Sequence, residues 1–170
     1  MNNFQELIVN RRSIRKYKTE AVSQEQIDKL LQAAMYAPSA RNEQPWHFIV
    51  VTDRNMLNKI MQSHPYANML KDAPLAVVVC ADDTIEKTEG YWVQDCSAAT
   101  QNILLAAKAM DLGSVWLGVY PREERILAIS NLFNLPDNIH PLSIIAIGYP
   151  DEQKPVPLRY LEERIHNNQW

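Results

Sequence analysis

The stretch PLAVVVCADD, residues 74–83, decides the fold class. It places the apolar run 75–81 between a proline and two aspartates. A short apolar run with such boundaries and no polar alternation predicts a strand that is covered on both faces. Residues 142–147, LSIIAI, predict a second buried strand. We therefore expect a central sheet with a layer of helices on each side.

The remaining elements are predicted outward from these two strands. Ser23 and Gln26 form a capping box that opens a helix, which should end before Pro38. Gly113 is expected to cap the helix that precedes it. The predicted helices span residues 3–10, 24–37, 54–62, 91–110 and 122–130, and the further strands span 46–52 and 115–119. Four strands interleaved with helices indicate one three-layer α/β or α+β domain over residues 1–170.

The glycine count excludes two large functional classes. The chain has 170 residues and only four glycines, where average usage of about 7% would give roughly twelve. No two of them have the spacing of G-x-G-x-x-G or of the P-loop. A self-contained dinucleotide-binding loop and a P-loop nucleotide site are therefore not expected.

Charge and residue usage narrow the remaining classes. The formal net charge of −3 disfavours a general nucleic-acid surface. Cys80 and Cys96 lie in apolar segments and are expected to be reduced thiols, and the four histidines are isolated, so no metal site is predicted. We recognise no secretory signal and no apolar run of membrane-spanning length, which favours a cytoplasmic protein without a membrane partner.

A basic cluster, RRSIRKYK at residues 11–18, is the first candidate binding motif. Arg11, Ser13 and Arg15 alternate, so in an extended segment their side chains point to one side. Two guanidinium groups and a hydroxyl on one side suit a phosphate. A solvated basic face, or a patch that binds nucleic acid or a phosphoprotein, is the alternative interpretation.

Two further segments could meet a ligand. PSARNEQPW, residues 38–46, holds a serine and polar amides between two prolines, which favours a rigid loop that presents hydrogen-bonding groups. GSVWLG, residues 113–118, carries glycines that permit a backbone to approach a flat ligand closely. Each segment alone is equally consistent with an ordinary turn or strand entry.

Together the three segments, in this order, resemble the nitroreductase family of flavoproteins, and IGYP at residues 147–150 continues the likeness. It covers the chain from about residue 4 to Trp170, and the length and the ending RIHNNQW are similar to short members. The resemblance implies an α+β fold with a central, mostly antiparallel sheet flanked by helices. It also implies a homodimer that exchanges C-terminal tails, with FMN at the subunit interface.

The resemblance assigns cofactor-binding roles to three sets of residues. The phosphate, the ribityl chain and the pyrimidine edge of FMN would contact Arg11, Arg12, Ser13, Arg15 and Arg159, with Lys154 and Asn68 as further candidates. The other subunit would cover the flavin with Pro38, Ser39, Ala40, Asn42 and Gln44. Backbone N–H groups at the reactive N5 edge would come from Leu117 and Gly118.

The C-terminal tail, residues 149–170, supports the dimer independently of the resemblance. It has no helical stripe but carries Leu158, Tyr160, Ile165 and Trp170, so it should pack on a partner subunit; a frayed terminus is the alternative interpretation. The chain departs from the family in two ways. Asp111 stands where many relatives have glycine, and the long insertion that larger relatives place over the flavin is missing.

The function that the resemblance implies is an FMN-dependent oxidoreductase. NADH or NADPH would reduce the flavin, and a nitroaromatic, quinone or similar electron-poor acceptor would then reoxidise it in a ping-pong cycle. The cofactor carries the chemistry, so no catalytic side chain is predicted. The alternatives are a flavin-binding or redox-sensing protein and a relative with dehalogenating or flavin-cleaving chemistry.

Overall fold

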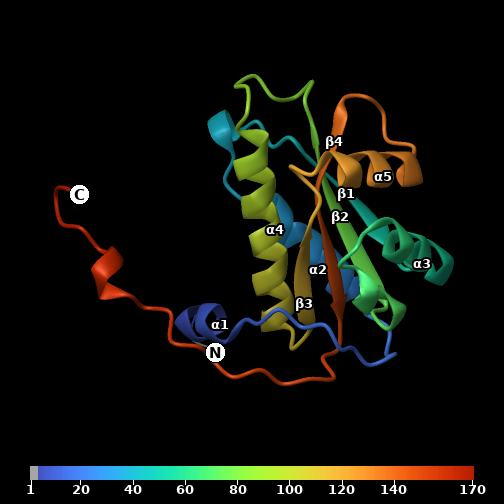
Figure 1. Ribbon diagram of the computed structural model, residues 1–170, viewed down its shortest axis with the longest axis horizontal. Helices are drawn as coiled ribbons and strands as arrows, with labels where there is room; N and C mark the ends of the chain where they lie inside the picture. The colour runs from blue at the N-terminus through green and yellow to red at the C-terminus, as the bar shows by residue number, and fades with distance from the viewer. Residues whose placement is uncertain (1–3) are drawn as a thin grey trace.

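The computed structural model describes residues 4–170 and places one four-stranded sheet between two pairs of helices (Figure 1). The strands follow the order β1-β2-β4-β3, and each neighbouring pair is antiparallel. The strands are β1 Trp46–Val51, β2 Leu75–Asp82, β3 Gly113–Gly118 and β4 Ile139–Gly148. The helices are α1 Phe4–Asn10, α2 Gln24–Met35, α3 Arg54–Ser63, α4 Trp92–Ala109 and α5 Glu123–Phe133. The α+β alternative and the antiparallel sheet are confirmed; residue 3 of the first predicted helix lies outside the described residues.

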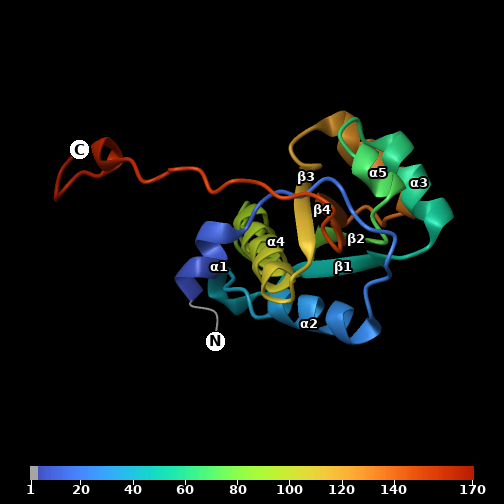
Figure 2. The same ribbon diagram turned by 90° about the horizontal axis from the view of Figure 1, so that it is seen from below.

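β2 explains why the sheet has helices on both faces. Its residue Val77 belongs to a core cluster with Ile103 of α4, whereas the next residue, Val78, belongs to a cluster with Ile60 of α3. Figure 2 shows α2 and α4 on one face of the sheet and α3 and α5 on the other. Because both faces are covered, β2 is apolar at consecutive positions and not only at alternate ones.

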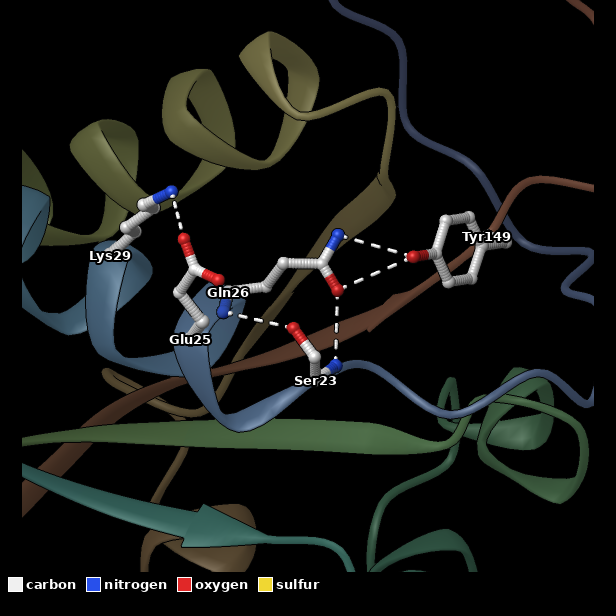
Figure 3. A network of polar contacts seen from close by, with 5 residues as sticks. All are labelled: Ser23, Glu25, Gln26, Lys29 and Tyr149. Carbon is white, nitrogen blue, oxygen red and sulfur yellow. Dashed lines mark hydrogen bonds and ion pairs between the residues drawn. The ribbon is translucent and has the colours of Figure 1, made fainter.

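The start of α2 is tied to the end of the sheet through one side chain. The Ser23 hydroxyl accepts a hydrogen bond from the Gln26 N–H at 3.2 Å, and Gln26 Oε1 accepts one from the Ser23 N–H at 3.0 Å (Figure 3). The Gln26 amide also bonds the Tyr149 hydroxyl at 3.2 Å. The predicted capping box is therefore confirmed, and it also fixes the point where the chain leaves β4.

The prediction that Gly113 caps the long helix is wrong. α4 ends at Ala109, and Asp111 adopts the left-handed conformation with φ 57°. Aspartate tolerates this region better than most residues, so Asp111 can adopt it without a glycine at this position. Gly113 instead begins β3, where a Cβ would lie 2.8 Å from Cγ2 of Ile14.

The segment 16–18 and the segment 149–151, which follows β4, lie side by side at one end of the sheet. The Lys18 N–H donates to the Tyr149 carbonyl and the Asp151 N–H donates to the Lys16 carbonyl, both at 2.9 Å. Beyond this contact the tail extends away from the body in both views (Figures 1 and 2). Its side chains, among them Leu158 and Trp170, are exposed to solvent.

Candidate functional site

A cavity of about 430 Å³ lies where the segment 11–14, the start of β3 and the start of the tail meet. Its charged lining residues are Arg11, Arg12, Lys108, Lys154, Asp111 and Glu152. Four cations against two carboxylates give this cavity a positive balance, in a protein whose net charge is negative. The lining therefore favours an anionic ligand.

Two of these cations hold the tail against the N-terminal segment. The Arg12 guanidinium donates to the carbonyls of Val9 and Arg11, and across the chain to that of Pro155 at 3.0 Å. Lys154 Nζ donates to the Ser13 carbonyl at 2.6 Å. Both side chains thus donate hydrogen bonds to backbone carbonyls, and these bonds hold the backbone on either side of Arg11 in place.

Arg11 is half-buried and lies among other cations. Burial lowers the pKa of Arg11, and the positive charges of Arg12 and Arg159 lower it further. Within residues 4–170, no ion pair involves Arg11 or Arg159. A multiply charged anion would relieve this repulsion, and a phosphate has the oxygen geometry that guanidinium groups bind.

A second cavity, of about 440 Å³, lies at the other end of β3. Four predicted site residues line it, namely Arg15, Asn68, Leu117 and Gly118. The N–H of Arg15 donates to Glu152 Oε1, which in turn lies 3.2 Å from Lys154 Nζ. Partial burial opposes ionisation of Glu152, but these two contacts hold its pKa below the usual range. Arg11 and Arg15 therefore reach different cavities from one short segment.

β3 is an edge strand, and Gly118 lies at its open end. The Ser114 carbonyl accepts from the Ile14 N–H at 3.0 Å, on the side away from β4. Alternate residues of an antiparallel strand direct their backbone groups to the same side, so the N–H of Gly118 also faces away from β4, whereas that of Leu117 faces β4. A Cβ on Gly118 would meet no heavy atom within 4 Å. The backbone of Gly118 is thus open to a ligand.

Sequence reasoning did not place His64 and Arg125 at this site. His64 Nε2 lies 3.0 Å from the Gly118 carbonyl oxygen, and Arg125 Nη1 donates to the same oxygen at 2.9 Å. His64 follows α3 and Arg125 lies in α5, so only the packing of both helices on one face of the sheet brings them to Gly118. No spacing in the chain encodes this contact.

The predicted cofactor-binding loop, residues 38–46, contributes no residue to either cavity. The loop contains a short 3-10 turn, Ala40–Asn42, and its predicted site residues lie in this turn or beside it: Pro38, Ser39, Ala40, Asn42 and Gln44. The Ser39 hydroxyl accepts from the Gln44 N–H at 3.0 Å, and Gln44 Nε2 donates to Asn42 Oδ1 at 2.9 Å. The loop packs at the start of α4, whereas the segment 11–14 passes the other end of that helix (Figure 1). Within one chain the loop and the two cavities are therefore separate.

A buried carboxylate fixes this loop to α4. Asp95 Oδ1 accepts from the Ala40 N–H at 3.0 Å. Burial raises the pKa of Asp95, and the negative charges of Glu43 and Glu86 raise it further, although the Ala40 N–H opposes the shift. The rigid loop that the prolines predict is thus held by a charge that the sequence did not single out.

None of the helices within residues 4–170 has both the length and the apolar character that a membrane-spanning segment needs. No three His, Cys, Asp or Glu side chains gather there in a way that could hold a metal ion.

Comparisons with known proteins agree with this architecture. The family model described as "Nitroreductase family" matches residues 8–64 and 58–149. A protein of Methanothermobacter thermautotrophicus named "Putative NADH dehydrogenase/NAD(P)H nitroreductase" is 53% identical over 165 residues, which cover 97% of this chain and 86% of the relative.

Two solved structures extend the comparison. The FMN-dependent nitroreductase of Clostridium difficile superposes with a TM-score of 0.88 at 34% identity, covering 98% of this chain and 99% of that one. The NADPH:FMN oxidoreductase of Vibrio harveyi, solved with NAD+, has a TM-score of 0.87 at 28% identity and covers 99% and 78%. With the family model matching most of its length, this chain belongs to the nitroreductase family.

Proposed function

We propose that this protein binds FMN and uses NADH or NADPH to reduce electron-poor acceptors such as nitroaromatics and quinones. The observation that carries the proposal is the segment 11–15, which links Arg11, a guanidinium group without an ion pair within residues 4–170, to the open backbone of Gly118. Bound FMN supplies the redox chemistry, because its ring accepts a hydride and passes the electrons on. The protein needs to supply only binding, orientation and charge.

The cations and the open strand edge suit the two ends of FMN. Arg11 and Arg159, with Ser13 and Lys154 nearby, would hold the phosphate, and Arg12 would keep them in place through its bonds to backbone carbonyls. Four steps of extended chain reach at most about 14 Å, so Arg15 can serve the ring while Arg11 serves the phosphate. Its positive charge would stabilise negative charge that develops at the pyrimidine edge.

Asn68 and Gly118 would complete the contacts of the ring. Asn68 lines the same cavity as Arg15 and offers an amide to the pyrimidine. The N–H of Gly118 faces the open edge of β3, and we therefore assign it, in preference to that of Leu117, as the donor to N5. Leu117 would contribute its side chain to the cavity wall.

The site requires a second copy of the chain. The loop that contains Ser39 and Asn42 packs at the start of α4, whereas Arg11 shares a cavity with Lys108 in the last turn of α4, so a flavin that touches both would have to lie between two subunits. Exposed Leu158 and Trp170 in the extended tail would then be buried on the partner. This arrangement supports a homodimer with exchanged tails.

The nicotinamide and the acceptor would use one face in turn. The chain has no glycine-rich loop to hold a second phosphate group. The cavity at Gly118 also exposes Tyr66, whose ring could stack on a flat substrate. Hydride transfer from NADH or NADPH, release of the oxidised nucleotide and entry of the acceptor give a ping-pong cycle.

The visible spectrum of the purified protein tests the proposal first. We expect a yellow protein that releases FMN on denaturation and is bleached by NADH or NADPH without oxygen. Double-reciprocal plots at several acceptor concentrations should be parallel. A colourless protein that cannot be loaded with FMN, or a flavin that stays yellow with both donors, would contradict it.

Arg11→Ala tests the phosphate assignment. The variant should lose FMN while its far-UV circular dichroism is unchanged, and Arg11→Lys should retain part of the affinity. Arg122→Ala removes an exposed arginine at the start of α5 and is the matched control. Equal FMN occupancy in Arg11→Ala and Arg122→Ala would refute the assignment.

A further inference from the structure

The carbonyl of Gly118 receives two hydrogen bonds from two different helical regions. His64 Nε2 lies 3.0 Å from its oxygen and Arg125 Nη1 lies 2.9 Å from it. An edge-strand carbonyl that faces solvent needs no protein donor, because water satisfies it. Two side-chain donors on one such oxygen therefore fix the position of this residue.

His64 can act only as a donor toward Gly118. Its ring is buried, with 2% of the residue exposed, and its Nδ1 accepts a hydrogen bond from the Tyr66 N–H at 3.2 Å. In a neutral imidazole one nitrogen accepts and the other donates. The Tyr66 N–H thus selects the tautomer that carries its hydrogen on Nε2 and directs it at Gly118.

Arg125 is held in a costly position. Its guanidinium carbon lies 5.1 Å from the centre of the Tyr66 ring, and its Nε is buried without a hydrogen-bond partner in the described part of the chain. A buried donor without a partner lowers stability, so such a group in a native structure calls for an explanation. A requirement for a fixed Gly118 backbone supplies that explanation.

We propose that His64 and Arg125 form a clamp on the Gly118 carbonyl. The clamp positions the backbone of Gly118 so that the N–H of the same residue lies at the correct place for the flavin ring. Tyr66 holds both members, His64 through its backbone N–H and Arg125 through its ring. The two side chains are positioning residues that act through the Gly118 carbonyl, and His64 also lines the cavity at Gly118. The proposal rests on the proposed function, because it assigns the clamp to the same FMN site.

Variants of Arg125 in the FMN-loaded protein provide the first test. Arg125→Met removes the donor and the charge at similar volume, Arg125→Lys keeps a donor, and Arg122→Met, at the N-cap of the same helix, is the matched control. We expect Arg125→Met to keep FMN bound, because the phosphate cations are untouched. Its absorption spectrum should shift and its bleaching by NADH should slow about tenfold or more, since misplacement by about 1 Å costs up to about 100-fold. Arg125→Lys should recover most of the rate.

The tautomer of His64 provides a second test that needs no variant. Nitrogen chemical shifts of the FMN-loaded wild type should show a neutral ring with its hydrogen on Nε2 at pH 7. A hydrogen on Nδ1, or a cationic ring, would overturn the clamp even if Arg125→Met fails to fold.

The outcomes separate this proposal from the proposed function. If the wild type binds no FMN or is not bleached, the proposed function fails. If the wild type is bleached but Arg125→Met matches Arg122→Met in both spectrum and rate, the clamp fails and the proposed function stands.

Discussion

Replacing Gly118 with alanine separates a binding role from a structural one. A Cβ at this position meets no heavy atom within 4 Å, and Gly118 does not adopt a positive φ. Alanine therefore fits the backbone, and removing a glycine restricts the unfolded chain. The free energy of unfolding of the apoprotein should stay unchanged or rise by about 0.4–1 kcal/mol.

The same methyl group should interfere with a ring that lies against the Gly118 backbone. It projects about 1.5 Å from Cα, and carbon atoms approach favourably only to about 3.5–4.0 Å. A flavin in contact with Gly118 would thus move by roughly 1 Å. Misplacement of that size costs about 100-fold, equivalent to about 2.7 kcal/mol, so we expect slower bleaching by NADH and weaker FMN binding.

Gly113→Ala, at the other end of β3, is the matched control. Its Cβ would lie 2.8 Å from Cγ2 and 2.9 Å from Cβ of Ile14, which is buried, so Ile14 must move. Overpacking of this kind costs about 1–3 kcal/mol of unfolding free energy. Chemical denaturation of both apoproteins, FMN titration and anaerobic mixing with NADH measure the three quantities. The reasoning is refuted if Gly118→Ala binds FMN and is bleached like the wild type.

Three further changes test other parts of the structure. If exchanged tails hold the proposed dimer together, deleting residues 157–170 should give a monomer in light scattering, and a truncated protein that is dimeric would contradict this. Asp95→Asn keeps the acceptor for the Ala40 N–H. Because the pKa of Asp95 is raised in the fold, ionisation of Asp95 lowers the stability of the fold at a pH above that raised pKa. It has no such effect at a pH below 3.8, the usual pKa of aspartate, where the side chain is protonated in both states. The variant should therefore melt at a higher temperature at pH 7 but not near pH 4, and equal melting temperatures at pH 7 would contradict this. Burial, and the charge of Arg125 facing it from α5, lower the pKa of His64 below 6.5, although the Gly118 carbonyl opposes the shift. As the pH drops, His64 therefore takes up a proton in the unfolded chain before it does so in the fold, so the free energy of unfolding should fall below about pH 6.5. The rate at which NADH bleaches the flavin should fall only at more acidic pH. A bleaching rate that falls through pH 6.5 itself would contradict the lowered pKa of His64.

The secondary structure could be predicted because its signals are local. The apolar run 75–81 and the capping box at Ser23 depend on residues within a few positions of one another. Sequence reasoning failed at Gly113 because glycine serves two purposes, helix termination and close packing. The conformation of Asp111 and the position of Ile14 decided between them.

The resemblance named Arg15, Asn68, Leu117 and Gly118, and these four residues line one cavity. Their role toward a cofactor stays a prediction. The clamp was missed because its contact joins residues 64, 118 and 125 through the packing of α3 and α5 on the sheet. The hydrogen bonds of Arg12 to Val9 and Pro155 were missed for the same reason, since a basic cluster in the sequence does not show which cations the backbone uses.

The edge of β3 has to meet two opposing requirements. A ligand can reach the Gly118 backbone only if the edge stays unpaired, yet an unpaired edge can bind strands of other chains. The structure blocks the edge at both ends, with Ile14 on the Ser114 carbonyl and with His64 and Arg125 on the Gly118 carbonyl. Side-chain donors at Gly118 occupy the carbonyl but not the N–H, whereas a paired strand would occupy both. The proposed clamp therefore leaves the Gly118 N–H available to a flavin while it closes the edge to other strands.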